Sequence, residues 1–201
     1  MDSKLYFKGF LIIMLVSFVS VHYAKPRMTS MELPEEGVTS DTNFDKMMDV
    51  LSHKRCVNCH PNDNIPKQGE DSHPHYFGMS RGEDNLGFEA TKCTTCHQNE
   101  NNDYSGVPGA PEWSLAPAQM YWEGLSRKEI AASMMDPERN GGRTPEETMH
   151  HLTEHALVLW AWEPGVDANG VPREKPPVPK EEYIEAVKAW FEAGAVIPTD
   201  E

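Results

Sequence analysis

The pattern Cys-x-x-Cys-His occurs twice in this chain of 201 residues, at residues 56–60 and 93–97, and uses all four of its cysteines. In this pattern the two thiols add across the two vinyl groups of one haem, and the histidine puts its imidazole under the iron. Two intervening residues let one tight turn bring both sulfurs to the same porphyrin edge. The chain is therefore predicted to hold two covalent haems c through Cys56, Cys59, His60, Cys93, Cys96 and His97.

Zinc is the competing interpretation, because cysteine and histidine are also zinc ligands and paired Cys-x-x-Cys knuckles are common. Zinc ribbons separate their two knuckles by about 15–20 residues. The gap from Cys59 to Cys93 is longer than that. The spacing, together with the absence of a leftover cysteine, favours haem.

The beginning of the chain predicts export from the cytoplasm. Lys4 and Lys8 precede an apolar stretch at residues 10–21, and a polar segment follows it, which is the order of a secretory signal. Haem attachment to this motif also takes place outside the cytoplasm, so the two signals agree. Ala24 fits the last position before cleavage, but His22 is a poor match to the small residue expected there. The predicted location is periplasmic or otherwise exported, with an uncleaved membrane anchor as the alternative.

Composition favours a loop-rich domain whose core is partly supplied by cofactors. Together with the two motifs and the helix signals below, the expected fold is a mainly α, loop-rich cytochrome c domain in which a few short helices pack around two haems. Hydrophobic residues make up 38% of the chain, and 16 prolines and 14 glycines interrupt any long element. The expected organisation is a signal peptide at residues 1–24, a flexible tether at 25–40 and one dihaem domain at 41–201. The net charge of -14 argues against binding to nucleic acid and favours partner proteins with basic surfaces.

Two capping boxes give the clearest helix starts, Ser126 with Glu129 and Thr144 with Glu147. The first helix is expected to stop at Asp136, before a proline, and the second to run to the segment of Trp160 and Trp162. Helical spacing of apolar residues predicts two further helices. One follows Ser40, the last ends at Gly194, and they carry Phe44, Met47, Met48 and Leu51, and Tyr183, Ile184, Val187 and Trp190, respectively. No strand is predicted.

The residue on the far face of each iron decides the chemistry, because axial ligands move the haem potential over about 0.8 V. His73 and His75 are the first choice. They lie between the two motifs, and their spacing in an extended segment points them to opposite sides, so each is predicted to ligate a different iron. The other possible ligands are His53 and Met120, each for the second iron, and His151. His150 and His155 are expected to be exposed.

Two more features have alternative interpretations. The turn at residues 139–143 carries Arg139 and Arg143, which either reach haem propionates or lie in solvent. The tryptophans either shield the haems from water, which would tune their potential, or belong to an ordinary core. They are Trp113, Trp122, Trp160 and Trp162.

Five sequence blocks together carry a family resemblance. They are residues 55–61 (Arg-Cys-Val-Asn-Cys-His-Pro), the loop of 68–69 and 73–75 (Gln-Gly and His-Pro-His), 105–111 (Ser-Gly-Val-Pro-Gly-Ala-Pro), 136–143 (Asp-Pro-Glu-Arg-Asn-Gly-Gly-Arg) and 160–162 (Trp-Ala-Trp). These blocks resemble a family of small exported dihaem cytochromes whose members are often labelled as a subunit of isoquinoline 1-oxidoreductase. The similarity spans about residues 44–198.

The resemblance implies an electron-transfer partner for a molybdenum hydroxylase of the xanthine-oxidase type. The family pattern has counterparts of His53, His73, His75, Met120 and His151, but not of His150 or His155. Its usual final cysteine is Ile197 in this chain, which affects no haem ligand.

Electron transfer is the predicted function, from a periplasmic dehydrogenase to a downstream acceptor. Possible iron ligands are plentiful, and the sequence shows no Ser/His/Asp or acid/base constellation, so we do not expect an enzyme. The alternatives are a haem enzyme of the peroxidase type and a haem sensor. Both need an open position on an iron.

Overall fold

The computed structural model describes residues 40–199. The predicted signal peptide, and the predicted tether up to residue 39, lie outside the described residues. Within residues 40–199, no helix is long and apolar enough to cross a membrane.

The described chain is rich in short helices. Its α-helices are α1 (Ser40–Leu51), α2 (Lys54–Val57), α3 (Arg127–Met135), α4 (Pro145–Glu154), α5 (Ala156–Leu159) and α6 (Lys180–Glu192). Single turns of 3-10 helix lie at Tyr76–Gly78, Cys93–Thr95, Ala118–Met120 and Trp160–Trp162. This confirms a mainly α class with short helices.

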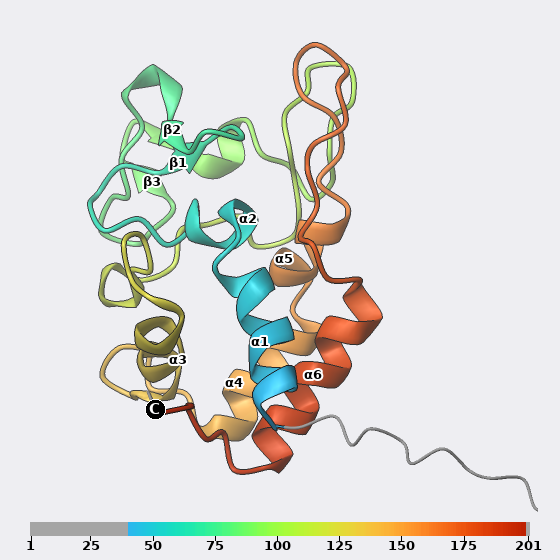
Figure 1. The fold of residues 1–201 in the computed structure, drawn as a ribbon. Coiled ribbons are helices and arrows are strands. Elements are labelled where there is room, and N and C mark those ends of the chain that lie inside the picture. The colour runs from blue at the N-terminus through green and yellow to red at the C-terminus, as the bar shows by residue number, and fades with distance from the viewer. Residues whose placement is uncertain (1–39, 200–201) are drawn as a thin grey trace, which may run out of the picture. The chain divides into compact units, whose positions relative to one another are not determined.

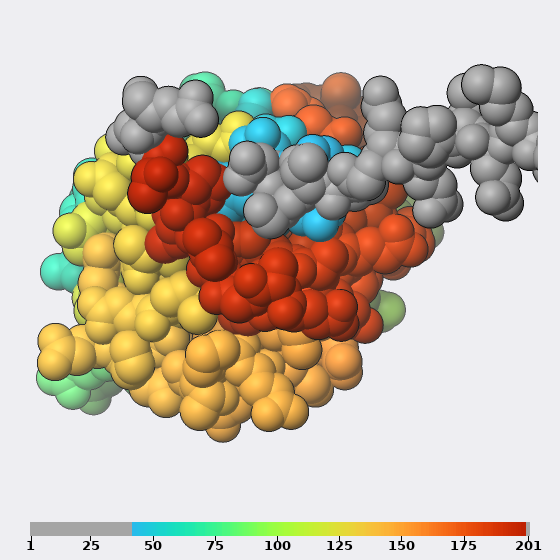
Figure 2. Space-filling view, turned by 60° about the horizontal axis from the view of Figure 1, so that its bottom comes forward, coloured from blue at the N-terminus to red at the C-terminus, as the bar shows by residue number. Residues whose placement is uncertain are grey.

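Helices α1, α4 and α6 lie side by side, and α3 packs against α1 and α4 (Figure 1). Seen from the end opposite the loops, the segment of α6 lies between those of α1 and α4 (Figure 2). As its periodicity predicted, α1 turns Phe44, Met47, Met48 and Leu51 inward. Fully burying one such side chain stabilises the fold by about 1.5–3 kcal/mol. These helices therefore contribute most of the apolar core.

Both capping boxes are confirmed. The Ser126 and Thr144 side chains accept from the backbone N–H groups of Glu129 and Glu147, whose carboxylates accept in return. As expected, α3 ends at Met135, because the residue before a proline disfavours helical geometry.

The expected length of α4 is wrong. The helix ends at Glu154, and His155 has extended backbone angles before the chain resumes in α5 and a 3-10 turn. The His155 ring Nε2 lies 2.9 Å from a carboxylate oxygen of Glu112, a residue of the loop region. The break thus coincides with a contact to a distant segment, which the local sequence does not predict.

The absence of strands is also wrong, although the strands are minimal. β1 (Lys67–Gln68) pairs antiparallel with β2 (His73–Pro74), and β3 (Gly87–Phe88) pairs with β4 (Thr91–Lys92). Strands of two residues are too short to show the alternation that predicts a strand.

The loop region at residues 58–126 is held by hydrogen bonds to backbone carbonyls rather than by long elements. The buried Arg81 guanidinium donates to the carbonyls of Pro61, Asp63 and Ala116. The Ala116 N–H in turn donates to the Cys59 carbonyl over 3.0 Å. Arg81 therefore joins the segment that follows the first motif to the later segment around Ala116.

Candidate haem sites

Each Cys-x-x-Cys-His motif forms one tight turn, as two thiols on one porphyrin edge require. In the first motif the N–H groups of Cys59 and His60 donate to carbonyls three residues earlier, over 3.1 and 2.9 Å. In the second, Cys96 and His97 both donate to the Cys93 carbonyl, over 3.2 and 2.9 Å. All four cysteines are free thiols.

The two motif histidines are held in the same way. His60 Nδ1 donates to the Met120 carbonyl and His97 Nδ1 to the Pro108 carbonyl, each over 2.7 Å. Such a bond fixes the ring orientation and the tautomer, and it leaves Nε2 available for a metal. Both rings therefore have the form that a proximal iron ligand needs.

A tryptophan also stacks on each of these rings. Trp122 lies parallel to His60 with ring centroids 3.6 Å apart, and Trp113 lies parallel to His97 at 4.5 Å, both at an interplanar angle of 8°. The ring centroids of Trp160 and Trp113 lie 4.9 Å apart, and the two rings meet edge to face. Trp162 is buried, and its indole N–H donates to the Val178 carbonyl. Trp113 and Trp122 thus belong to the sites, and Trp162 belongs to the core.

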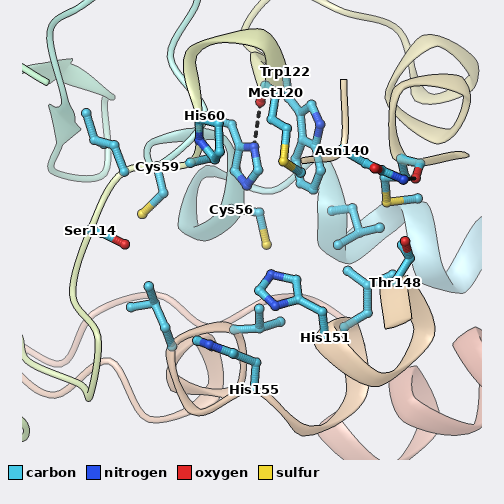
Figure 3. Close-up of a pocket in the computed structure, with 18 of the residues that line it drawn as sticks. Cys56, Cys59, His60, Ser114, Met120, Trp122, Asn140, Thr148, His151 and His155 are labelled. Carbon is cyan, nitrogen blue, oxygen red and sulfur yellow. Dashed lines mark hydrogen bonds between the residues drawn. The ribbon is translucent and has the colours of Figure 1, made fainter. Parts of the chain in front are cut away.

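A cavity of about 230 Å³ opens beside the first motif, between the loop region and the helices. In Figure 3 the His151 ring rises from α4 on the side of the cavity that faces Cys56 and His60. Burial lowers the pKa of His60 to about 4, and burial together with the Arg143 charge lowers that of His151 to about 4. Both rings are therefore neutral near pH 7, the form that binds metals.

His75 faces the histidine of the second motif. Its ring centroid lies 6.0 Å from that of His97, and the two planes are inclined by 70°. Two imidazoles that bind one metal from opposite sides have centroids roughly 6 Å apart, because each metal–nitrogen bond is about 2 Å long. His75 Nδ1 donates to the Tyr76 carbonyl over 2.8 Å, which leaves Nε2 for a metal.

The structure does not bring His73 and His53 to either motif in the same way. His73 contacts Asp71 through Nδ1 at 2.5 Å and Gln68 through Nε2 at 3.0 Å. His53 accepts from the Arg55 N–H through Nδ1 and contacts Glu174 through Nε2 at 3.3 Å. In both histidines the two ring nitrogens already have protein partners.

Among the other candidate residues, some lie where the sequence predicted and others do not. Met120, predicted for the second iron, lies in the first site beside His60, whose Nδ1 binds its carbonyl. His150 is exposed, as expected, and pairs with Glu154. His155 lines the cavity, 4.7 Å from the His151 ring, instead of being exposed. The i, i+4 spacing of His151 and His155 was the sequence signal for this proximity.

The cavity carries two kinds of chemistry that together suit a haem. The thiols of Cys56 and Cys59 line it, and burial raises their pKa values to about 12 and about 11. The neighbouring Cys93 thiol adds to the shift at Cys59, so the two motifs adjoin. Polar side chains also line the cavity, among them Trp122, Thr148 and His155. Each of the three has a buried nitrogen or oxygen atom without a hydrogen-bond partner.

The described residues contain no group of three or more His, Cys, Asp or Glu side chains arranged to hold a metal ion. A zinc site takes three or four protein ligands, whereas a haem iron takes four nitrogens from the porphyrin.

No protein-family model matches the chain, and comparisons with curated proteins and with solved structures found no match.

Proposed function

We propose that this chain is an exported dihaem c-type cytochrome that carries electrons. Cys56 and Cys59 would attach the first haem, and His60 and His151 would hold its iron. Cys93 and Cys96 would attach the second haem, and His97 and His75 would hold its iron. The observation that carries the proposal is that each motif histidine has its Nδ1 bound to a backbone carbonyl and a second imidazole across from it.

Two axial imidazoles on each iron favour electron transfer over catalysis or gas binding, because both of the latter need an open position. When bound, each haem supplies a one-electron iron couple. The protein's own contribution is to hold the imidazoles still. The carbonyl bonds and the parallel tryptophans Trp113 and Trp122 fix the proximal rings, which keeps their geometry alike in both oxidation states.

The proposed donor is a molybdenum-hydroxylase-type dehydrogenase, and the electrons pass on to a downstream acceptor. The family resemblance of the sequence blocks supports this donor. The net charge of -14 favours partners with basic surfaces, chiefly through the association rate.

The test of the axial ligands is optical and electron paramagnetic resonance spectroscopy of the full chain, produced in a host that attaches haem c. We expect both haems to be low-spin when oxidised and when reduced, with signals of paired imidazoles. A high-spin ferric component would contradict the proposal and would favour an open iron, as in a haem enzyme or sensor.

The test of the donor is reduction of the cytochrome by a purified molybdenum hydroxylase and its substrate. The rate should fall as ionic strength rises, because salt screens the attraction between opposite charges. A failure of reduction, with low-spin spectra intact, would remove this donor and leave the cytochrome proposal standing.

A further inference from the structure

The segment between the two motifs exposes apolar side chains around the second site. The exposed large side chains of this segment are Ile65, Tyr76, Phe77 and Leu86, and we call these four residues the apolar patch. The His75 N–H donates to the Pro66 carbonyl and the Cys93 N–H to the Leu86 carbonyl, each over 2.8 Å. These bonds hold Pro66, the neighbour of Ile65, beside His75 and Leu86 beside the second motif. Exposed apolar groups that gather in one place mark interaction surfaces.

Phe77 is the most unusual member of the apolar patch. Its side chain is 89% exposed, and its backbone is left-handed, with φ at 64°. A bulky side chain disfavours this conformation, and exposure gives its ring no compensating burial. Folding alone therefore does not explain a phenylalanine here. Strained residues that persist in a fold gather at functional sites, and Phe77 lies two residues after His75.

The exposed residues lie on both sides of the second pair of imidazoles. The His75 and His97 ring centroids are 6.0 Å apart. Tyr76 and Phe77 follow His75 directly, and Thr94, Thr95 and Cys96 of the motif are also exposed. The first motif adjoins the helical core instead, through Leu51 and Leu152. The second site is therefore the one that another protein can approach closely.

The charges of the same segment say which kind of protein that would be. Residues 68–100 hold six acidic and two basic residues, namely Glu70, Asp71, Glu83, Asp84, Glu89 and Glu100 against Arg81 and Lys92. Arg81 is buried, and Lys92 forms an ion pair with Asp84. Glu83 and Glu89 are exposed. This charge attracts a basic protein surface and repels an acidic one.

We propose that the apolar patch is the docking surface for a redox protein whose own electron-transfer site has an apolar centre ringed by lysine and arginine side chains. The inference rests on the proposed function. Apolar and aromatic side chains form the centre of a typical protein interface, and polar groups surround it. Opposite charges around the centre speed the encounter of the two proteins. Electrons thus pass between this chain and its partner at the second site.

The test compares the full-length haem-loaded chain with Phe77→Asn. The probe is a small basic c-type cytochrome whose haem edge is ringed by lysines. We expect the rate of electron exchange, measured by stopped flow at low salt, to fall by at least about fivefold, because aromatic residues at the centre of an interface contribute most of its affinity. Calorimetry with the zinc-substituted probe, which accepts no electrons, should show binding weakened by the same factor.

Two further measurements separate docking from damage to the site. Hexaammineruthenium is too small to need a docking surface, so its rate of electron exchange should stay at the wild-type value. Asparagine tolerates left-handed backbone better than phenylalanine, so urea denaturation should find Phe77→Asn at least as stable as the wild type.

The chain offers a matched control for the lost side chain. Val196 is also exposed, but it follows α6, and its carbonyl accepts from Trp190 Nε1 over 2.8 Å. Val196→Asn should leave exchange with the basic cytochrome unchanged.

The acidic residues have a control of equal charge. Glu83→Gln with Glu89→Gln should slow the exchange and flatten its salt dependence. Glu185→Gln with Glu192→Gln, on the exposed side of α6, makes the same change in net charge and should slow it less.

Several results would overturn the docking surface. They are no binding of the probe by the wild type at low salt, wild-type binding and exchange in Phe77→Asn, and equal slowing of that variant with hexaammineruthenium. Binding to phosphatidylcholine vesicles that Phe77→Asn abolishes would assign the patch to a lipid surface instead. Haem content is measured first, because a wild-type chain without haem would refute the proposed function itself.

Discussion

The two Cys-x-x-Cys-His motifs share their inner contacts and differ in their surroundings. In both, the histidine binds a backbone carbonyl and stacks on a tryptophan. The first motif follows α1, and its cavity includes Leu51 and Leu152 from the helical core. The second lies in the loop region, where Thr94, Thr95 and Cys96 are exposed.

This difference separates what the motif determines from what the fold adds. The thiol turn and the proximal histidine are built locally and repeat, whereas burial depends on the elements packed around them. Burial disfavours the ferric state relative to the ferrous state, since the former carries the additional charge. We therefore expect the first haem to have the higher midpoint potential.

Removing the thiols of one motif should have the largest effect. Cys56→Ser with Cys59→Ser should lose one haem and strongly destabilise the helical core, because the emptied space adjoins that core. Cys93→Ser with Cys96→Ser should also lose one haem, with a smaller loss of stability. Intact mass and urea denaturation measure the two effects. An equal loss of stability in both double variants would contradict the contrast between the sites.

Replacing the far-face histidines should change one haem at a time. His151→Ala and His75→Ala should each convert one iron from low-spin to high-spin, because each removes one axial imidazole. His73→Ala and His53→Ala are the matched controls, since both nitrogens of those rings have other partners. Low-spin spectra for both haems in His75→Ala would remove that residue from the ligand set.

A core substitution should distinguish the helical surroundings from the loops. Trp190 of α6 is fully buried and contacts Phe44 of α1, with ring centroids 6.2 Å apart. Trp190→Ala should lower the free energy of unfolding by about 3–5 kcal/mol. The exposed Tyr104 lies in the loop region, and Tyr104→Ala should change stability by about 0.5 kcal/mol or less. Urea denaturation compares the two, and similar losses would argue against a helical core as the main source of stability.

The smallest effect concerns the start of the helix that presents His151. Thr144→Ala removes the side-chain cap of α4 and should cost about 1 kcal/mol, while Thr144→Ser keeps the hydroxyl and most of the stability. The spectrum of the second haem should stay unchanged in both variants. A change confined to the second haem would show that the two sites are not independent in the way described.

The sequence predicts correctly several features that short segments determine. The capping boxes at Ser126 and Thr144 and the inward face of α1 all follow from local spacing, and all are present. The expected pairing of His73 and His75 with different irons rested on local geometry alone. The structure brings His75 to His97, whereas His73 contacts Asp71 and Gln68.

What local spacing could not supply comes from contacts between distant segments. His155, at the break of α4, contacts Glu112, and the position of His151 opposite His60 depends on how α4 packs beside the loop region. The sequence of α4 alone identifies neither Glu112 as the contact of His155 nor His60 as the residue opposite His151. The two short hairpins were missed because two residues cannot display a period.

The central claim is that each pair of cysteines carries one haem, and the mass of the intact purified chain tests it most directly. A denatured sample from a haem c-maturing host should retain its red colour and weigh as much as the processed polypeptide plus two haems. A colourless chain with the mass of the polypeptide alone would contradict the account.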